Sequence, residues 1–275
     1  MKKNDYFIDV SAYQAADLTA ICQAAGTRNT IIKVSEGTSW LSPVRVTQTQ
    51  TSNCVGYYHF ARFGGNVALA QAEADFFIAN LPAKATYLVC DYEDSASGNR
   101  QANTNAVLAF MDKCSQAGYQ PIYYSYKPFT LANVDYTQII AKYPNSLWIA
   151  AYPNYEVTPD PVWSVFPSME GIRWWQFTSV GITGGLDKNI VLLDDSATST
   201  VVQEILKGMK NHMDYTVAEK SGKYPYVVIT NGVAARMKHL SSIAAFQEAG
   251  AKDISLETED YQSLVAELDA RKPKK

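Results

Sequence analysis

The sequence has little of what metal sites and disulfide frameworks require. Its 275 residues include only three histidines and four cysteines. Cys22, Cys54, Cys90 and Cys114 are widely spaced and form neither a CxxC motif nor a Cys/His ligand spacing. Isolated cysteines in apolar stretches are typical of free buried thiols in a reducing compartment. We therefore expect neither a zinc site nor disulfide bonds.

The sequence also lacks a strong charge of one sign and a long apolar segment. A formal net charge of −3 argues against a general nucleic-acid binder. No apolar stretch approaches the roughly 20 residues that a membrane-spanning helix needs. Residues 1–5 lead directly into a strand-like run, without the apolar region of a signal peptide. We expect no nucleic-acid partner, no membrane span and no signal peptide.

What is present is a repeated alternation of strand-like and helical patterns. Hydrophobic residues at 47% and charged residues at 19% are typical of a soluble globular protein. Helical periodicity is clearest at 66–81 and 102–117, whereas the later gaps between strands contain prolines and glycines instead. Alternating strands and helices predict a parallel sheet, here an irregular (β/α) barrel of eight strands with helices missing between the last strands. The strands are expected at residues 6–10, 30–34, 55–60, 87–91, 121–124, 147–151, 172–177 and 189–193.

In barrels of this kind the active site lies where the strands end. Here nearly every expected strand ends in, or is closely followed by, a polar or ionisable residue, as a site for a polar ligand requires. These residues are Asp9, Lys33, Glu36, His59, Arg62, Asp91, Glu93, Tyr124, Tyr126, Tyr152, Gln176 and Asp187.

The tripeptide Asp91-Tyr92-Glu93 is the strongest indication of chemistry. Residues two apart on a strand point to the same face, so Asp91 and Glu93 present two carboxyls side by side after the apolar run 87–90. Two like charges held this close do not both ionise easily, and one carboxyl should keep its proton near neutral pH. A protonated carboxyl beside an ionised one can cleave a glycosidic bond. The alternative is a strand that ends in an acidic, solvated loop, which the following Asp94 favours.

The composition changes after residue 194. We expect the barrel to span residues 1–194, a polar linker to span 195–200, and a small C-terminal α/β domain with a βαβα pattern to span 201–275. Its expected elements are a helix with Val202, Ile205, Leu206 and Met209 on one face, a strand at 226–230, a helix marked by Val233, Met237, Leu240 and Ala244 and closed by Gly250, a strand at 254–256, and a last helix that Thr258 could cap.

Several groups of residues follow one another in order along roughly residues 5–195. They are Phe7-Ile8-Asp9-Val10-Ser11 with Gln14, Ile32-Lys33-Val34-Ser35-Glu36-Gly37, Gly56-Tyr57-Tyr58-His59-Phe60-Ala61, Asp91-Tyr92-Glu93, and Trp175-Gln176-Phe177 with Gly185-Leu186-Asp187. In this order they resemble the motifs of family 25 of the glycoside hydrolases, the muramidases first described from fungi, streptomycetes and phages. Asp91-Tyr92-Glu93 sits where that family has its paired catalytic carboxylates. Asp187-Lys188-Asn189 resembles the family's ending of Asp, an apolar residue and Asn, with Lys188 as the departure.

The resemblance implies hydrolysis, with retained configuration, of the β-1,4 bond between N-acetylmuramic acid and N-acetylglucosamine. Glu93 would be the general acid, and Asp91 would stay ionised. Asp91 would act either as a nucleophile or as the residue that orients the substrate's own N-acetyl group for attack. We favour the second role because every target sugar at this site carries that group, although the backbone spacing leaves both open. Asp9 and Asp187 would complete an acidic floor, and no cofactor is implied.

The same resemblance suggests which residues contact the substrate, although several of them have simpler interpretations. Asp9 could cap the loop at 11–14, Lys33 and Glu36 could form an exposed ion pair, and His59 could be a core histidine in an aromatic run. The candidates for substrate contact are Glu36, Lys33, His59, Arg62, Tyr124, Tyr152 and Gln176.

A muramidase barrel joined to a small C-terminal domain is the layout of phage endolysins that act on Gram-positive hosts. The resemblance implies peptidoglycan as the partner, and an enzyme held in the host cytoplasm until a phage holin releases it to the cell wall. The C-terminal domain is expected to bind the wall or to form a homo-oligomer. Met209 and Met213 would permit an internal start and a separate C-terminal fragment, but methionines also fill apolar helix faces. The alternative functions are a chitinase-like hydrolase of the same barrel type and an inactive carbohydrate-binding or oligomerisation protein.

Overall fold

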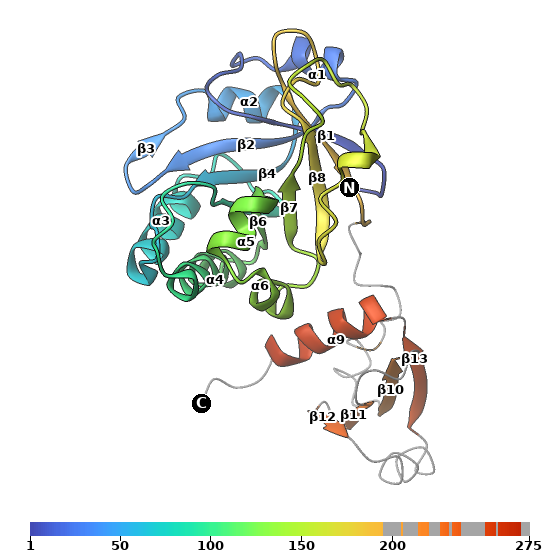
Figure 1. The fold of residues 1–275 in the computed structure, drawn as a ribbon. Coiled ribbons are helices and arrows are strands. Elements are labelled where there is room, and N and C mark those ends of the chain that lie inside the picture. Colours follow the sequence, from blue (N-terminus) through green and yellow to red (C-terminus); the bar gives the residue numbers. More distant parts are fainter. Residues whose placement is uncertain are drawn as a thin grey trace. The chain divides into compact units, whose positions relative to one another are not determined.

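The chain divides into two compact units, Met1–Asp195 and Ser196–Lys275, each with its own core. A computed structural model describes residues 1–194, 205, 214–219, 226–230, 233–237, 251–256 and 258–270 (Figure 1). None of the helices within these ranges is long and apolar enough to cross a membrane.

The first unit is a closed barrel of eight strands, which confirms the predicted fold class. Each strand pairs with the next in chain order, and the first pairs with both the second and the last, which closes the sheet. The strands are β1 (Tyr6–Val10), β2 (Asn29–Glu36), β4 (Asn53–Phe60), β5 (Tyr87–Asp91), β6 (Gln120–Tyr126), β7 (Leu147–Ala150), β8 (Ile172–Thr178) and β9 (Asp187–Val191).

The last strand departs from the parallel sheet that the alternating pattern predicts. β9 runs antiparallel to both β8 and β1, because the short connection from β8 carries no helix and turns the chain straight back. The start of β9 therefore lies at the barrel end where the other strands finish, and Asp187 pairs with Asp9 across the two strands. A two-residue strand, β3 (Trp40–Leu41), was also not predicted; it extends the end of β2 as a hairpin.

Helices cover the outside of the barrel up to β7 (Figure 1). Two of them begin at asparagine caps: Asn66 accepts a hydrogen bond from the Leu69 N–H, and Asn99 accepts one from the Ala102 N–H. Between β7 and β8 the described chain forms only a single short 3-10 turn, η1 (Trp163–Val165), as the prolines of that segment predict. The helices are α1 (Thr19–Ala25), α2 (Arg45–Thr51), α3 (Val67–Ala79), α4 (Arg100–Gln116), α5 (Lys127–Asn133) and α6 (Tyr136–Lys142).

Two apolar layers determine where polar groups can lie. One layer packs the outer face of the strands against the helices, with Phe77 and Phe110 at its centre. The other fills the barrel with aromatic rings, where Phe7 contacts Trp148 and Trp174 at centroid distances of 5.4 and 5.1 Å. Because the interior is filled with these rings, we expect a site for a polar ligand at the end of the barrel where the parallel strands finish.

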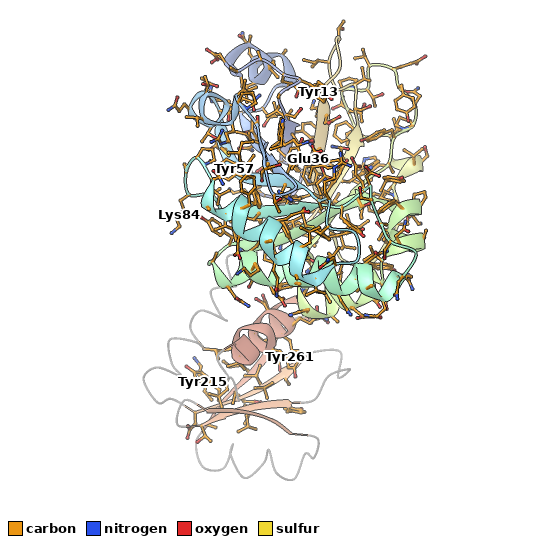
Figure 2. The ribbon with its side chains drawn as sticks, turned by 90° about the vertical axis from the view of Figure 1, so that its left-hand side faces the viewer. Tyr13, Glu36, Tyr57, Lys84, Tyr215 and Tyr261 are labelled. Carbon is orange, nitrogen blue, oxygen red and sulfur yellow. The ribbon has the colours of Figure 1, made fainter. Side chains whose placement is uncertain are left out.

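The second unit contains a four-stranded sheet with order β12-β11-β10-β13 and a helix, α9 (Thr258–Ala270). Tyr215 from the sheet and Tyr261 from the helix share its core (Figure 2). The strands are β10 (Tyr215–Glu219), β11 (Tyr226–Thr230), β12 (Val233–Met237) and β13 (Lys252–Leu256).

One prediction for this unit was wrong: Val233–Met237 is a strand paired with β11, and not the start of a helix. A further strand, β10, was not predicted. The overlooked signal is the pair Asn231-Gly232 between two apolar runs, which is typical of a tight hairpin. The predicted helix near 202–209, apart from Ile205, and the later marks at Leu240, Ala244 and Gly250 lie outside the described residues.

Candidate active site

Four carboxyl groups gather at the open end of the barrel. Asp9 comes from β1, Asp91 from the end of β5, Glu93 from the loop just after it, and Asp187 from the start of β9. Asp9 and Asp187 are direct neighbours across two strands, and the charge of Asp9 acts on the other three groups. The sequence placed these residues at strand ends, and the closure of the barrel brings them together.

Asp9 and Asp187 share a hydrogen bond deep in this cluster. Asp9 is 7% exposed, and its Oδ2 accepts from Gln176 Nε2 at 2.9 Å and from Asn189 Nδ2 at 2.8 Å. These donors stabilise the ionised form of Asp9. Burial and the adjacent charge of Asp9 raise the pKa of Asp187 to about 9. Burial also raises the pKa of Asp9, but its hydrogen bonds to Asn189, Gln176 and Asp187 lower it. The shared proton is therefore assigned to Asp187.

A layer of amides and hydroxyls orients these donors. Gln176 Oε1 accepts hydrogen bonds from the Tyr124 hydroxyl, at 2.7 Å, and from the Tyr152 hydroxyl. These two bonds orient the Gln176 amide so that its Nε2 faces Asp9. Asn189 is oriented in the same way, because its Oδ1 accepts from Trp148 Nε1 at 2.8 Å. Tyr124, Tyr152 and Gln176 thus lie at the predicted site. Asn189 was not assigned a role from the sequence, although it is part of the Asp187-Lys188-Asn189 motif.

Asp91 keeps one buried carboxyl oxygen unpaired among the residues that the structure describes. The residue is 6% exposed, and the unpaired atom is its Oδ1. Burial, followed by the charge of Glu93, raises the pKa of Asp91 well above its usual range, and Lys33 opposes this shift. An unpaired buried acceptor is costly, so this oxygen is suited to receive a donor from a bound ligand.

Glu93 is half-buried at the mouth of the barrel. Burial, followed by the negative charges of Asp9 and Asp94, raises its pKa, while Lys33 lowers it. A raised pKa keeps a carboxylic acid protonated closer to neutral pH, as a general acid requires.

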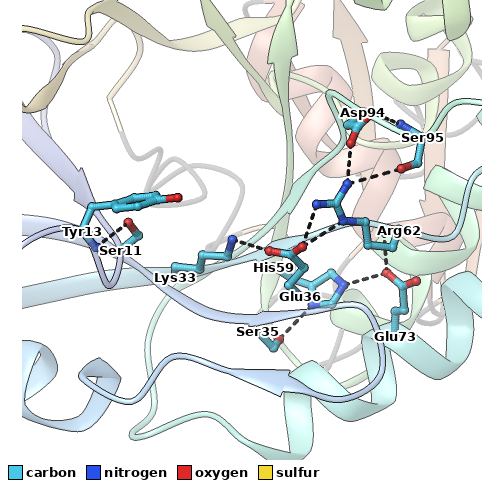
Figure 3. Close-up of polar contacts among 10 residues, drawn as sticks. All are labelled: Ser11, Tyr13, Lys33, Ser35, Glu36, His59, Arg62, Glu73, Asp94 and Ser95. Atoms are coloured by element: carbon cyan, nitrogen blue, oxygen red, sulfur yellow. Dashed lines mark hydrogen bonds and ion pairs between the residues drawn. The ribbon is translucent and has the colours of Figure 1, made fainter.

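A chain of alternating charges runs from Lys33 through Glu36 and Arg62 to Asp94 (Figure 3). Lys33 Nζ lies 2.8 Å from Glu36 Oε2, Arg62 binds the other Glu36 oxygen at 2.9 and 2.7 Å, and Arg62 also pairs with Asp94. The Lys33 ammonium lies over the rings of Trp40 and Phe60. The ion pair considered as the simpler role of Lys33 and Glu36 is present. Substrate contact by Lys33, Glu36 or Arg62 stays a prediction.

His59 does not belong to the site, which corrects one candidate for substrate contact. Its ring is fully buried between the barrel and α3, where Nδ1 lies 2.8 Å from Ser35 Oγ and Nε2 lies 2.8 Å from Glu73 Oε2. The residue before it, Tyr58, points inward: the charges of all four carboxyls contribute to its raised pKa. Successive side chains on a strand point to opposite faces, so Tyr58 and His59 cannot both face the site. Tyr58, like Asn189, was not assigned a role from the sequence.

A cavity of about 490 Å³ adjoins Asp187. One wall is the loop after β1, including Tyr13, which is 98% exposed (Figure 2). The other wall is the connection from β8 to β9, including Gly184 and Gly185, whose positive φ angles suit glycine. Of the four carboxyls, Asp187 is the one that lines this cavity.

A closed barrel with paired carboxyls of raised pKa at its mouth is typical of the glycosidases that work with two carboxyl groups. The model of one family, "Glycosyl hydrolases family 25", matches residues 8–186. The chain belongs to that family.

Comparison with individual proteins agrees with this assignment. The chain is 57% identical over 195 residues to a lysozyme of Streptococcus phage Cp-1, covering 71% of this chain and 56% of that protein. It is 66% identical over 208 residues to a protein of Streptococcus phage B30 named D-alanyl-L-alanine endopeptidase, covering 75% and 47%. The chain therefore spans about half the length of these relatives.

Solved structures show the same fold. The Cpl-1 endolysin, solved with a peptidoglycan analogue, superposes with a TM-score of 0.68 at 57% identity, covering 71% of this chain and 56% of that one. The CTP1L endolysin has a TM-score of 0.56 over 98% of both chains at 19% identity. At that identity the likeness to CTP1L concerns the fold alone.

Proposed function

We propose that this protein is a muramidase of the phage endolysin type. Its substrate is the β-1,4 bond between N-acetylmuramic acid and N-acetylglucosamine in the peptidoglycan of a Gram-positive host. The observation that carries the proposal is the pair Asp91 and Glu93, both with raised pKa, beside Asp9 and Asp187 at the barrel mouth. Membership of family 25 and the identity to phage lysozymes support it.

Glu93 is the general acid in this mechanism. It donates its proton to the glycosidic oxygen as the bond from that oxygen to the sugar's anomeric carbon breaks. In the second half of the reaction the Glu93 carboxylate takes a proton from the attacking water, so that the enzyme returns to its starting state. The raised pKa keeps the donated proton available toward neutral pH.

Asp91 assists the substrate's own acetamido group. The acetamido oxygen attacks the anomeric carbon and forms a cyclic intermediate as the leaving group departs from the opposite face. Water then attacks from the face that the leaving group left, so the two inversions retain the configuration. The unpaired, buried Oδ1 of Asp91 supports this role, because an acetamido N–H is the donor that it lacks. Direct nucleophilic attack by Asp91 is the alternative, and it would also retain the configuration.

The surrounding groups stabilise charge and hold the sugar. Asp9 contributes negative charge to the barrel mouth, where positive charge develops on the sugar ring, and Asp187 shares its proton with Asp9. Tyr58, Tyr124 and Tyr152 line the inner wall of the mouth with hydroxyl groups, and we expect these groups to contact substrate.

The second unit serves attachment in this proposal. We infer that it binds the cell wall or joins two copies of the chain, and that the protein stays in the host cytoplasm until a holin releases it. The layout of a barrel followed by a small unit supports this inference. Pull-down of the full chain on host walls and light scattering in solution would test the two alternatives.

The substitution Glu93→Gln tests the catalytic proposal. It should lower kcat on purified Gram-positive walls by about 100-fold or more, because the acid is lost while shape is kept. The parent enzyme should create new reducing ends at N-acetylmuramic acid. Cleavage of chitin oligomers without wall lysis would favour a chitinase-like hydrolase, and new amino groups without new reducing ends would indicate a peptidase. Full activity of Glu93→Gln would overturn the acid assignment.

A further inference from the structure

The chain just before Glu93 is attached to the neighbouring loop between β4 and α3. Tyr92 is fully buried, stacks on Phe63 with ring centroids 5.1 Å apart, and donates its hydroxyl to the Gly64 carbonyl at 3.1 Å. The Asp91 carbonyl accepts from the Ala61 N–H at 2.8 Å. These contacts hold the backbone on the N-terminal side of Glu93.

The residue just after Glu93 is attached to the same loop by an ion pair. Asp94 pairs with the Arg62 guanidinium (Figure 3). Arg62 is a well-oriented partner, because Glu36 accepts two of its N–H groups and Phe60 lies 4.5 Å beneath its guanidinium. Its backbone N–H also donates to the buried Glu73 at 2.9 Å.

The two loops also approach closely through their backbones. Gly64 has a φ of +54°, and a Cβ added there would lie 3.0 Å from the Ser95 carbonyl oxygen. The stretch that carries Glu93 is therefore bound to one loop before, after and beside the acid. Such anchors restrict the backbone torsions that aim the Glu93 side chain.

We propose that the ion pair of Arg62 and Asp94, together with the Tyr92 anchor, positions the Glu93 carboxyl for proton transfer. Arg62 and Asp94 are then positioning residues for the acid step. The inference rests on the proposed function, since it takes Glu93 as the acid. An exposed ion pair adds little to folding stability. The contribution of this pair is therefore to the position of the Glu93 carboxyl.

The charge of Asp94 also acts on Glu93 directly. Asp94 raises the pKa of Glu93, as Asp9 does, whereas Lys33 lowers it. Asp91 and Asp187 face Glu93 as well, since its charge raises the pKa of each. The other ionisable groups that face Glu93 are the hydroxyls of Tyr58, Tyr124 and Tyr152.

The test compares Asp94→Asn and Arg62→Gln in the full chain, with soluble peptidoglycan oligosaccharides as substrate. Each change should lower kcat by about tenfold with little change in KM, because a small misplacement of a catalytic group is costly. Asp94→Asn should also move the alkaline limb of the kcat profile to lower pH by roughly half a unit, because a negative charge near the acid is lost. Asp94→Glu and Arg62→Lys should recover part of the rate.

Asp75→Asn is the matched control. Asp75 is 59% exposed and pairs with Lys113 at 2.6 Å, while Asp94 is 60% exposed, so both changes remove the same charge from a similar surface ion pair. The double variant Arg62→Gln with Asp94→Asn should lose no more than the worse single variant, because both remove one interaction.

Two results would overturn the inference while leaving the proposed function in place. In the first, Asp94→Asn and Arg62→Gln retain the kcat and pH profile of Asp75→Asn, although Glu93→Gln is inactive. In the second, the loss lies in KM alone, which would make the pair a substrate contact. An active Glu93→Gln would instead remove the acid assignment on which both rest.

Discussion

At the scale of single residues, burial sets the acidity of the site more than residue type does. Asp9, Asp91 and Asp187 are ordinary aspartates by sequence, yet burial is the largest cause of the raised pKa of each. Hydrogen bonds then divide the roles: donors surround Asp9, whereas Asp91 keeps an unpaired oxygen.

Asp187 should make the protein less stable as the pH rises. Its folded-state pKa of about 9 exceeds the usual 3.8, so between these values the folded protein binds more protons than the unfolded chain. Stability then falls with rising pH in this window. Asp187→Asn, which keeps a donor for Asp9, should raise the free energy of unfolding at neutral pH by on the order of 2 kcal/mol.

Denaturant unfolding from about pH 5 to pH 9 measures this effect. The free energy of unfolding should fall less steeply with rising pH for Asp187→Asn than for the parent. Glu170→Gln, which changes an exposed carboxyl, should leave that pH dependence as it is in the parent. Equal slopes for the parent and Asp187→Asn would show that Asp187 is ionised in the folded protein.

At the scale of elements, a buried polar contact ties β4 to α3. Glu73 of α3 is 1% exposed and its Oε2 accepts from His59 Nε2 at 2.8 Å and from the Arg62 N–H at 2.9 Å. Burial lowers the pKa of His59, while the hydrogen bond and the charge of Glu73 oppose this shift. The contact places the start of the loop that holds Arg62.

Glu73→Ala should therefore destabilise the barrel. It leaves two buried N–H donors without an acceptor, which should cost about 2–4 kcal/mol of the free energy of unfolding. Glu73→Gln should cost less, because its amide oxygen can still accept. Gln71→Ala, at an exposed position on the same helix, controls for helix propensity in the same urea titration. A loss no larger than that of Gln71→Ala would contradict the role given to Glu73.

Periodicity predicted the barrel elements well and the second unit poorly, for a physical reason. In the barrel, short apolar strand runs alternate with helices, and the periodic pattern is clearest at the two longest helices, α3 and α4, so the two patterns differ clearly there. In the second unit Val233 and Met237 lie four residues apart, a spacing that fits a helix face as well as the two ends of a five-residue strand. The preceding Asn231-Gly232 pair favours the strand, and the pairing with β11 shows it.

At the scale of the whole molecule, the barrel unit should fold and act without the second unit. Each unit has its own apolar core, and all eight barrel strands lie within the first unit. A fragment of residues 1–194 should therefore unfold cooperatively within a few degrees of one transition of the full chain. It should also cleave soluble oligosaccharides at about the rate of the full chain.

Calorimetry and a reducing-end assay test this expectation. If the second unit attaches the enzyme to walls, the fragment should lose activity on intact walls much more than on soluble chains. A fragment without a cooperative transition would show that the barrel needs the second unit to fold.

The sequence by itself determined the barrel and the residues at its strand ends, because alternating apolar patterns and local motifs are properties of neighbouring residues. The tertiary structure decided what those residues touch. In the folded protein His59 lies in the core and Tyr58 faces the barrel mouth. β9 runs antiparallel, so that Asp187 lies beside Asp9, and Arg62 pairs with Asp94. These relations join residues far apart along the chain, and burial, which shifts the carboxyl pKa values, exists only once the barrel has closed.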